Sequence, residues 1–249
     1  MTLHIESAGE GRDLVLIHGW GMHSGCWDAV VAHLSEKFRI HLVDLPGHGL
    51  SPHESGDDWV EALSKSFPFE VDLCGWSLGG QLAIEWARRH PDQVGRLVMV
   101  SSTPCFTLRE DWAHGVSGEI FRQFSDEFET SPDAALKRFL LLQAQGGTGA
   151  ARLFRQLQQS VGKGAQMEGL RAGLELLREF DLRMAAQSVR QRALILHGEC
   201  DRLTPIGAGV WLSERMDARL IAIPGCAHVP FLFVPDFFVS SLLEFFHES

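Results

Sequence analysis

The chain has 249 residues, of which 45% are hydrophobic, and these values suit one α/β domain with a sizeable core. Its formal net charge of −10 argues against general binding to nucleic acid or to an anionic membrane surface. The apolar runs are too short to span a bilayer, and residues 1–7 lack the pattern of a signal peptide. The five cysteines are scattered without a Cys-x-x-Cys pair, so we expect reduced thiols, a cytoplasmic location and no metal site.

Short apolar runs alternate with helical patterns along the first hundred residues. Residues 14–17 form a continuous apolar run, which is typical of a strand buried on both faces. An extended segment at 4–7 precedes this run, and the stretch at 8–13 between them predicts a hairpin turn. Further strands are expected at 40–45, 71–74 and 96–101, and helices at 58–66 and 81–89. This alternation predicts right-handed crossovers and a mostly parallel sheet.

The pattern changes between residues 106 and 186, where helical patterns dominate and no convincing strand is found. A glycine-rich run at 146–149 interrupts these helices. Alternation resumes with a strand at 193–197, a strand at 219–223 and a final helix at about 235–247. We therefore expect an α/β core made of residues 1–105 and 187–249, with a helical lid insertion at residues 106–186.

The stretch Gly-Trp-Ser-Leu-Gly (75–79) lies between an apolar run and a strong helical pattern. This is the pattern of a nucleophile elbow, in which a serine occupies a tight strand-to-helix turn. Gly75 and Gly79 leave room where side chains would collide with the turned backbone. A glycine-rich turn with an ordinary surface serine would give the same five residues, so other parts of the chain must decide whether Ser77 is a nucleophile.

A serine hydroxyl is a poor nucleophile at neutral pH and needs a base, which itself needs an orienting carboxylate. In sheets with a nucleophile elbow, the acid and then the histidine follow the serine in the chain. Asp201 follows the strand at 193–197, and His228 lies in the loop after the last strand. Both therefore lie at carboxyl ends of strands, where ligands bind in open α/β sheets. We expect Ser77, Asp201 and His228 to form a catalytic triad, with Glu199 as a rival for the acid.

An oxyanion hole needs two preorganised N–H donors, each worth roughly 2.7–4 kcal/mol of the barrier. The Leu78 N–H at the start of the helix would supply one. The second should come from the loop after an early strand, which reads His-Gly-Trp-Gly (18–21). We assign this donor to the backbone of Trp20. The Trp20 side chain would either wall the pocket or pack as a core tryptophan.

These four features, in this order, resemble the α/β-hydrolase family along essentially the whole chain. A closer resemblance is to the esterases that act on the methyl ester of pimeloyl-acyl-carrier protein in biotin synthesis. It depends on Trp20 and on the stretches Ser-Ser-Thr-Pro-Cys-Phe (101–106) and Arg-Phe-Leu-Leu-Leu-Gln (138–143), which are similar in that family. The resemblance implies hydrolysis of that ester by a mechanism that needs no cofactor. It also implies substrate contacts at Trp20, Ser77, Leu78, Phe139, Leu140, Leu141, Leu142, Gln143 and His228, although the three leucines could equally be helix core.

An enzyme of net charge −10 would repel an acidic acyl-carrier protein unless it had a local basic face. Residues 134–167 contain no acidic side chain. The basic residues of this stretch include Lys137, Arg138, Arg152, Arg155 and Lys163. We interpret them as a docking surface for the carrier protein, and a solvated lid surface would have the same composition.

Three other functions stay open at this point. The first is a general short-chain carboxylesterase or lactonase. The second is a carbon–carbon bond hydrolase, which would use the same triad. The third is a non-catalytic binding protein built on a hydrolase fold.

Overall fold

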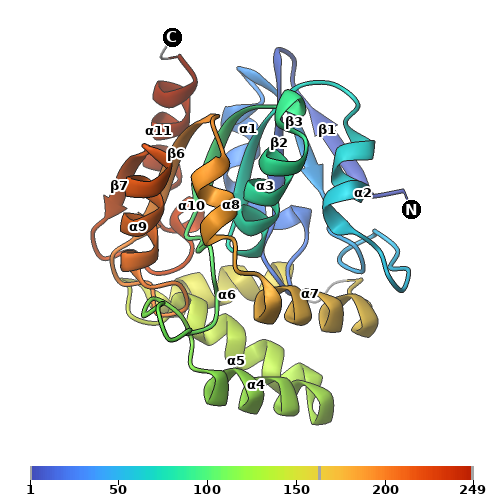
Figure 1. Ribbon diagram of the computed structural model, residues 1–249, viewed down its shortest axis with the longest axis vertical. Helices are drawn as coiled ribbons and strands as arrows, with labels where there is room; N and C mark the ends of the chain where they lie inside the picture. Colours follow the sequence, from blue (N-terminus) through green and yellow to red (C-terminus); the bar gives the residue numbers. More distant parts are fainter. Residues whose placement is uncertain (1, 162–163, 248–249) are drawn as a thin grey trace.

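The computed structural model describes residues 2–161 and 164–247 (Figure 1). Within these residues the centre is a seven-stranded sheet in the order β1-β3-β2-β4-β5-β6-β7. Neighbouring strands are parallel except for β1 and β3. The strands are β1 (Ile5–Ala8), β2 (Arg12–Ile17), β3 (Phe38–Val43), β4 (Val71–Trp76), β5 (Val94–Val100), β6 (Arg192–Gly198) and β7 (Arg219–Ile223).

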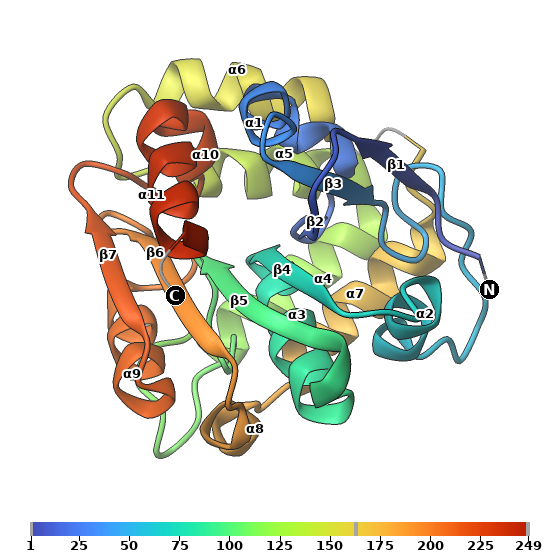
Figure 2. The ribbon, with the colours of Figure 1, turned by 90° about the horizontal axis from the view of Figure 1, so that it is seen from above.

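Helices cover both faces of the sheet (Figure 2). On one face lie α1 (Asp28–Leu34) and α11 (Pro235–His247). On the other face lie α2 (Trp59–Ser66), α3 (Leu78–Arg89), α8 (Arg183–Ser188) and α9 (Ile206–Met216). The short helices are η1 (Ser24–Trp27), η2 (Pro91–Gln93) and α10 (Pro230–Phe233).

Two hydrophobic layers join the sheet to these helices, because alternate side chains of a strand point to opposite faces. On β2, Val15 and Ile17 pack on the side of α2 and α3, whereas Leu14 and Leu16 pack on the side of α1 and α11. Strands β5 and β6 divide their side chains in the same way. These four residues are fully buried, which confirms the strand with two covered faces predicted at 14–17.

The hairpin predicted near the N-terminus is wrong in its pairing. The chain does turn between β1 and β2, where Gly9 and Gly11 have positive φ angles. However, β1 pairs antiparallel with β3, with Ile5 opposite Val43. Strand β2 already has parallel partners on both edges, namely β3 and β4, so no edge is left for β1. The other predicted strands and helices of the core are found with small shifts of their ends.

The connection from β5 to β6 is helical. It contains α4 (Gly118–Thr130), α5 (Pro132–Ala144), α6 (Ala150–Ser160) and α7 (Met167–Glu179), which lie together below the sheet in Figure 1, and then α8. We call α4–α7 the cap. Helix α8 returns to the sheet and packs beside α3 and α9. No helix in the described ranges is both long enough and apolar enough to cross a membrane.

Helix α2 offers a test of local stability at its first turn. The Asp58 carboxylate accepts the N–H groups of Val60 and Glu61, each at 3.1 Å, and the Arg89 guanidinium at 2.9 Å. Asp58→Ala should lower the free energy of unfolding by about 1 kcal/mol because the helix loses its N-cap. Thermal unfolding followed by circular dichroism should show a melting temperature lower by roughly 2–4 °C.

The matched control for this prediction is Glu36→Ala, which removes an exposed carboxylate after α1. This variant should melt within about 1 °C of the wild type, since isolated surface substitutions usually change stability little. Equal melting temperatures for the two variants would contradict the capping role of Asp58.

Candidate active site

Ser77 lies at the turn between β4 and α3. Its φ of 55° and ψ of −117° fall where glycine is favoured, a strain of about 1–3 kcal/mol that only the surroundings can hold. The Ser77 carbonyl accepts the Ser102 hydroxyl at 2.7 Å and the Gly80 N–H at 3.0 Å. Leu78 opens α3 directly after this residue, so its N–H is one of the unpaired donors of a helix N-terminus.

Two glycines let α3 approach the sheet at this turn. A Cβ atom on Gly75 would lie 2.3 Å from the carbonyl oxygen of Gly79. A Cβ atom on Gly79 would lie 2.2 Å from the carbonyl oxygen of Ile17. Both distances are far inside van der Waals contact, so any side chain at either position would force α3 away from the strands.

Asp201 and His228 form a buried pair beyond the ends of β6 and β7. The Asp201 Oδ2 atom lies 2.7 Å from Nδ1 of His228. Its Oδ1 atom accepts the N–H groups of Leu203 at 2.9 Å and Thr204 at 3.0 Å. Burial raises the pKa of Asp201, but the facing imidazole and these hydrogen bonds outweigh it and hold the pKa below its ordinary value. The carboxylate is therefore ionised at neutral pH and accepts the Nδ1 proton of the imidazole.

The other ring nitrogen of His228 is available as an acceptor. Its Nε2 atom is buried and has no hydrogen-bond partner among residues 2–161 and 164–247. Trp76, next to Ser77, donates its indole N–H to the His228 carbonyl at 2.8 Å, and the two rings pack with centroids 5.5 Å apart. The turn of Ser77 and the loop of His228 are thus tied together. Glu199, the rival acid, is exposed.

The loop after β2 lies against the serine turn, since a Cβ atom on Gly19 would be 3.2 Å from that of Ser77. The Gly19 carbonyl accepts the His18 Nδ1–H at 2.8 Å and the Met22 N–H at 3.3 Å. In a trans peptide the N–H points away from the C=O. The Trp20 N–H therefore points away from these two donors, and it donates to no acceptor within the described residues.

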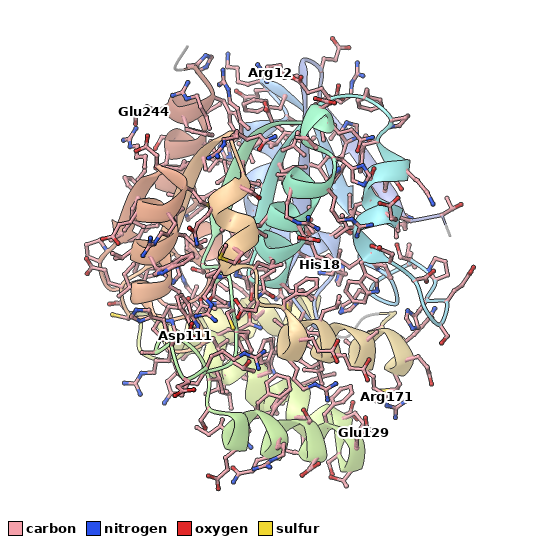
Figure 3. All side chains as sticks on the ribbon, in the orientation of Figure 1. Arg12, His18, Asp111, Glu129, Arg171 and Glu244 are labelled. Carbon is pink, nitrogen blue, oxygen red and sulfur yellow. The ribbon has the colours of Figure 1, made fainter. Side chains whose placement is uncertain are left out.

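His18 is held as a neutral imidazole. Its Nε2 atom accepts the Leu45 N–H at 3.0 Å, so the ring proton must lie on Nδ1, where it reaches the carbonyl of the next residue. Burial, together with the neighbouring His48, lowers the pKa of His18 to about 3. Figure 3 labels His18 inside the core between the sheet and the cap. The orientation of the following peptide is therefore constant over the physiological pH range.

The Trp20 side chain joins the sheet to the cap. Its indole N–H donates to the Leu170 carbonyl in α7 at 2.8 Å. The ring packs edge-on against Phe124 and Phe128 of α4 and Phe139 of α5, with centroids 4.9–5.6 Å apart. Trp20 is thus a buried core tryptophan, and two of its aromatic neighbours, Phe124 and Phe139, wall a cavity.

This cavity has a volume of about 410 Å³ and lies between α4, α5 and α7. Its lining is mainly leucine and phenylalanine, and the charged residues in it are Arg138 and Arg202. Leu203, two residues after Asp201, also lines it, so the cavity extends to the loop of the buried acid. A mainly apolar space of this volume suits an aliphatic chain.

The predicted contact run at 139–143 lies on α5 and is divided among three environments. Phe139 and Leu142 line the 410 Å³ cavity. Leu141 is 48% exposed and lines a second cavity of about 700 Å³ between α5 and α6. Leu140 packs in the core on the α1 and α11 side, and Gln143 is buried. A helix turns 100° per residue, so five consecutive side chains cannot all face one cavity. The substrate contacts of residues 139–143 stay a prediction.

Comparison with known proteins matches residues 14–240 to the model of the "Alpha/beta hydrolase family". The chain is 43% identical over 245 residues to the pimeloyl-[acyl-carrier protein] methyl ester esterase of Nitrosomonas europaea, covering 96% of this chain and 97% of that protein. It is 39% identical to the protein of the same name from Nitrosospira multiformis, covering 98% of each. The chain belongs to the alpha/beta hydrolase family. An esterase structure from Exiguobacterium antarcticum has the same fold, with a TM-score of 0.87 at 22% identity, covering 98% of this chain and 94% of that one.

The basic residues of this hydrolase's cap differ in their surroundings. Arg138 of α5 forms an ion pair with Glu127 of α4. Arg152 of α6 donates to two backbone carbonyls of α10 at 3.4 Å. Lys137 and Arg155 form no ion pair within the described residues, and Arg155 lines the 700 Å³ cavity with Arg138. Among the described residues of the interpreted docking surface, Arg138 is therefore ion-paired and Arg152 is held by backbone carbonyls, whereas Lys137 and Arg155 have neither kind of contact. Lys163 lies outside the described residues.

A further ion pair connects two helices of the cap, between Arg171 of α7 and Glu129 of α4, which are labelled in Figure 3. Their closest atoms are 2.8 Å apart, but both side chains are exposed. Exposed pairs contribute about 0–1 kcal/mol. The aromatic cluster around Trp20 therefore holds α4 in place more strongly than this pair does.

The described residues contain no group of three histidine, cysteine or acidic side chains that could hold a metal ion. All five cysteines are free. Burial raises the pKa of Cys74 and Cys226, so their thiols are poor nucleophiles.

Thr204, which no sequence motif singled out, also contacts the buried pair. Its hydroxyl lies 2.8 Å from Asp201 Oδ2, 3.0 Å from the Ser101 carbonyl and 3.3 Å from His228 Nδ1. His197 donates its Nε2–H to the Thr204 carbonyl at 2.6 Å. A threonine three residues after an aspartate is typical of a local turn, which was the available signal. The contact of Thr204 with the imidazole depends on two strands being neighbours and is not visible in the local sequence.

Thr204→Val should destabilise the protein in a pH-dependent way. The variant keeps the shape of the side chain and removes a hydroxyl donor to a carboxylate, an interaction worth about 1.5–3 kcal/mol. The pKa of Asp201 is lowered in the folded state, so its stabilisation is present above the ordinary value of 3.8 and is lost as the pH falls through the folded value. Urea unfolding should show the full loss at neutral pH and a smaller loss at about pH 3.

Thr204→Ser is the control, because it keeps the hydroxyl. It should recover most of the neutral-pH stability, apart from the small cost of a missing methyl group. A Thr204→Val variant that loses the same free energy at both pH values would show that the hydroxyl does not act through the Asp201 carboxylate.

Proposed function

We propose that this protein is a serine carboxylesterase that hydrolyses the methyl ester of pimeloyl-acyl-carrier protein in biotin synthesis. The buried Asp201–His228 pair is the observation that supports ester hydrolysis by a serine. Its Nε2 atom is free to accept a proton, and its loop is hydrogen-bonded to Trp76, the neighbour of Ser77. The substrate is supported by full-length relatives of that name at 43% and 39% identity.

In this proposal His228 is the general base and Ser77 is the nucleophile. His228 Nε2 takes the proton of the Ser77 hydroxyl as Oγ attacks the ester carbonyl, and the Asp201 carboxylate stabilises the imidazolium that forms. The tetrahedral intermediate collapses, and methanol leaves with the proton from Nε2. Water then attacks the acyl-enzyme with the same base, which releases the free carboxylic acid and the serine hydroxyl.

The oxyanion of both intermediates would be held by the N–H groups of Trp20 and Leu78. Each donor of this kind is worth roughly 2.7–4 kcal/mol of the barrier. The neutral His18 supports this role, since it fixes the carbonyl on the opposite side of the Trp20 peptide. The Leu78 donor is supported by its place at the N-terminus of α3, where the helix dipole favours negative charge.

We place the acyl chain in the 410 Å³ apolar cavity and the carrier protein over α5 and α6, with the cap as the lid. Lys137, Arg138, Arg152 and Arg155 would face the acidic carrier despite the net charge of −10. The free cysteines fit a reducing compartment, and we propose a cytoplasmic location.

Ser77→Ala should abolish hydrolysis of pimeloyl-acyl-carrier protein methyl ester while leaving the fold intact. The expected loss in kcat is at least about 10³-fold, because removing a triad member leaves only the oxyanion hole and binding. Methanol release measures turnover, and circular dichroism measures folding. Complementation of a biotin auxotroph that lacks the esterase should succeed with the wild type and fail with this variant. Turnover close to that of the wild type would overturn the assignment of the nucleophile.

Arg155→Glu and Lys137→Glu should each lower kcat/KM for the carrier-bound ester by about tenfold at low salt, because they reverse exposed charges on α6 and α5 that no ion pair among the described residues neutralises. The loss should shrink near 1 M salt, where the Debye length is about 3 Å. Hydrolysis of free pimeloyl methyl ester should be unchanged.

The control for these charge reversals is Lys65→Glu, an exposed residue on α2, far from α5 and α6 (Figure 1). It makes the same change in net charge and should leave both substrates unaffected. If all three variants hydrolyse the carrier-bound ester alike, the carrier does not dock on α5 and α6. Equal wild-type rates on free and carrier-bound esters would instead favour a general carboxylesterase.

A further inference from the structure

The segment that follows α5 packs on both loops of the buried pair. A Cβ atom on Gly146 would lie 2.6 Å from the Cys200 carbonyl oxygen, in the loop of the acid. A Cβ atom on Gly147 would lie 2.9 Å from the Ala227 nitrogen, in the loop of the histidine. The glycine-rich run therefore serves close backbone approach and is not merely a flexible link between two helices.

Two hydrogen bonds fix the same segment to the loop after β7. The backbone N–H of His228 donates to the carbonyl of Gln143 in the last turn of α5, at 3.1 Å. The N–H of Thr148 donates to the carbonyl of Gly225 at 2.8 Å. The last carbonyls of a helix lack partners within the helix and carry partial negative charge, so they are strong acceptors for an N–H. The cap thus holds the backbone of His228 itself.

We propose that the cap positions His228: residues 143–148, which we call the seating segment, set the place of the base relative to Ser77. This inference rests on the proposed function, in which His228 is the base. On the sheet side, the loop of His228 is held by the Trp76 indole, by the Asp201 carboxylate and by the Cys200 N–H, which donates to the Cys226 carbonyl at 2.8 Å. On the cap side, the seating segment holds it. A displacement of about 1 Å at a catalytic group can cost 10²-fold in rate. The cap is then part of the catalytic apparatus for every ester, including those too small to contact it.

The experiment compares three glycine substitutions within the cap. Gly147→Ala adds a methyl group against the histidine loop at a residue whose φ lies outside the left-handed region. Gly146→Ala adds one against the acid loop at a φ of 97°. Gly149→Ala is the control: its φ of 72° imposes backbone strain like that of Gly146→Ala, whereas its Cβ atom would have no neighbour within 4 Å. The probe is 4-nitrophenyl acetate, whose acyl group is too short to need the cap for binding.

We expect Gly147→Ala to lower kcat for this probe by about 10- to 100-fold with KM within twofold, since the base moves while the binding site does not. Gly146→Ala should show a smaller loss, and Gly149→Ala should keep the wild-type kcat. The indole N–H of Trp76 reports the histidine loop directly, so its proton NMR resonance should shift in Gly147→Ala and not in Gly149→Ala.

Wild-type kcat in a folded Gly147→Ala variant would overturn the inference, as would equal losses in all three variants. A loss confined to the carrier-bound ester would also overturn it, because the cap would then act only in binding. Ser77→Ala, assayed in parallel, distinguishes failure of the proposed function from failure of the positioning role. Turnover by Ser77→Ala at the wild-type rate would contradict the proposed function. An inactive Ser77→Ala together with a fully active Gly147→Ala would contradict only the positioning role.

Discussion

Helix α3 approaches the backbone of the sheet so closely that only glycine fits at positions 75 and 79. Gly75 and Gly79 allow carbonyl groups of α3 and β2 to lie where a Cβ atom would otherwise be, and Ser77 takes up the strain of the turn between them. The helix N-terminus then lies at the carboxyl edge of a parallel sheet. Since every parallel strand ends at that edge, the loops after β2, β6 and β7 meet there without any further device.

A second constraint is the cost of burying a carboxylate. An unpaired charge in the interior costs several kcal/mol, whereas one that is paired and fully hydrogen-bonded can be kept. Asp201 meets this condition with two backbone N–H groups, the Thr204 hydroxyl and the His228 imidazole. The same contacts that offset the free-energy cost of burying the carboxylate also fix the imidazole in one tautomer. Stability and orientation therefore have one physical cause at this site.

The sequence allowed prediction of the features that depend on local pattern and strand order. The buried strand at β2, the elbow glycines and the places of Asp201 and His228 after their strands follow from apolar runs and turn residues. The prediction of a hairpin between β1 and β2 is wrong because adjacency in the sequence cannot show that both edges of β2 are occupied by other strands. The ion pair between Arg138 and Glu127 was also not predictable from the sequence. The two residues belong to different helices, whose relative packing is set by the core.

Helix α5 shows how far a motif can be interpreted before the fold is known. The run from Arg138 to Gln143 resembles a substrate-contact motif, and a helix distributes it over separate neighbours. Phe139 faces the Trp20 cluster and the apolar cavity, Leu141 faces the cavity beside α6, and the Gln143 carbonyl holds the His228 N–H. One helix therefore contacts the 700 Å³ cavity, the 410 Å³ cavity and the backbone of His228. Because a helix moves as a unit, whatever displaces α5 from one of these neighbours also changes its contact with the others.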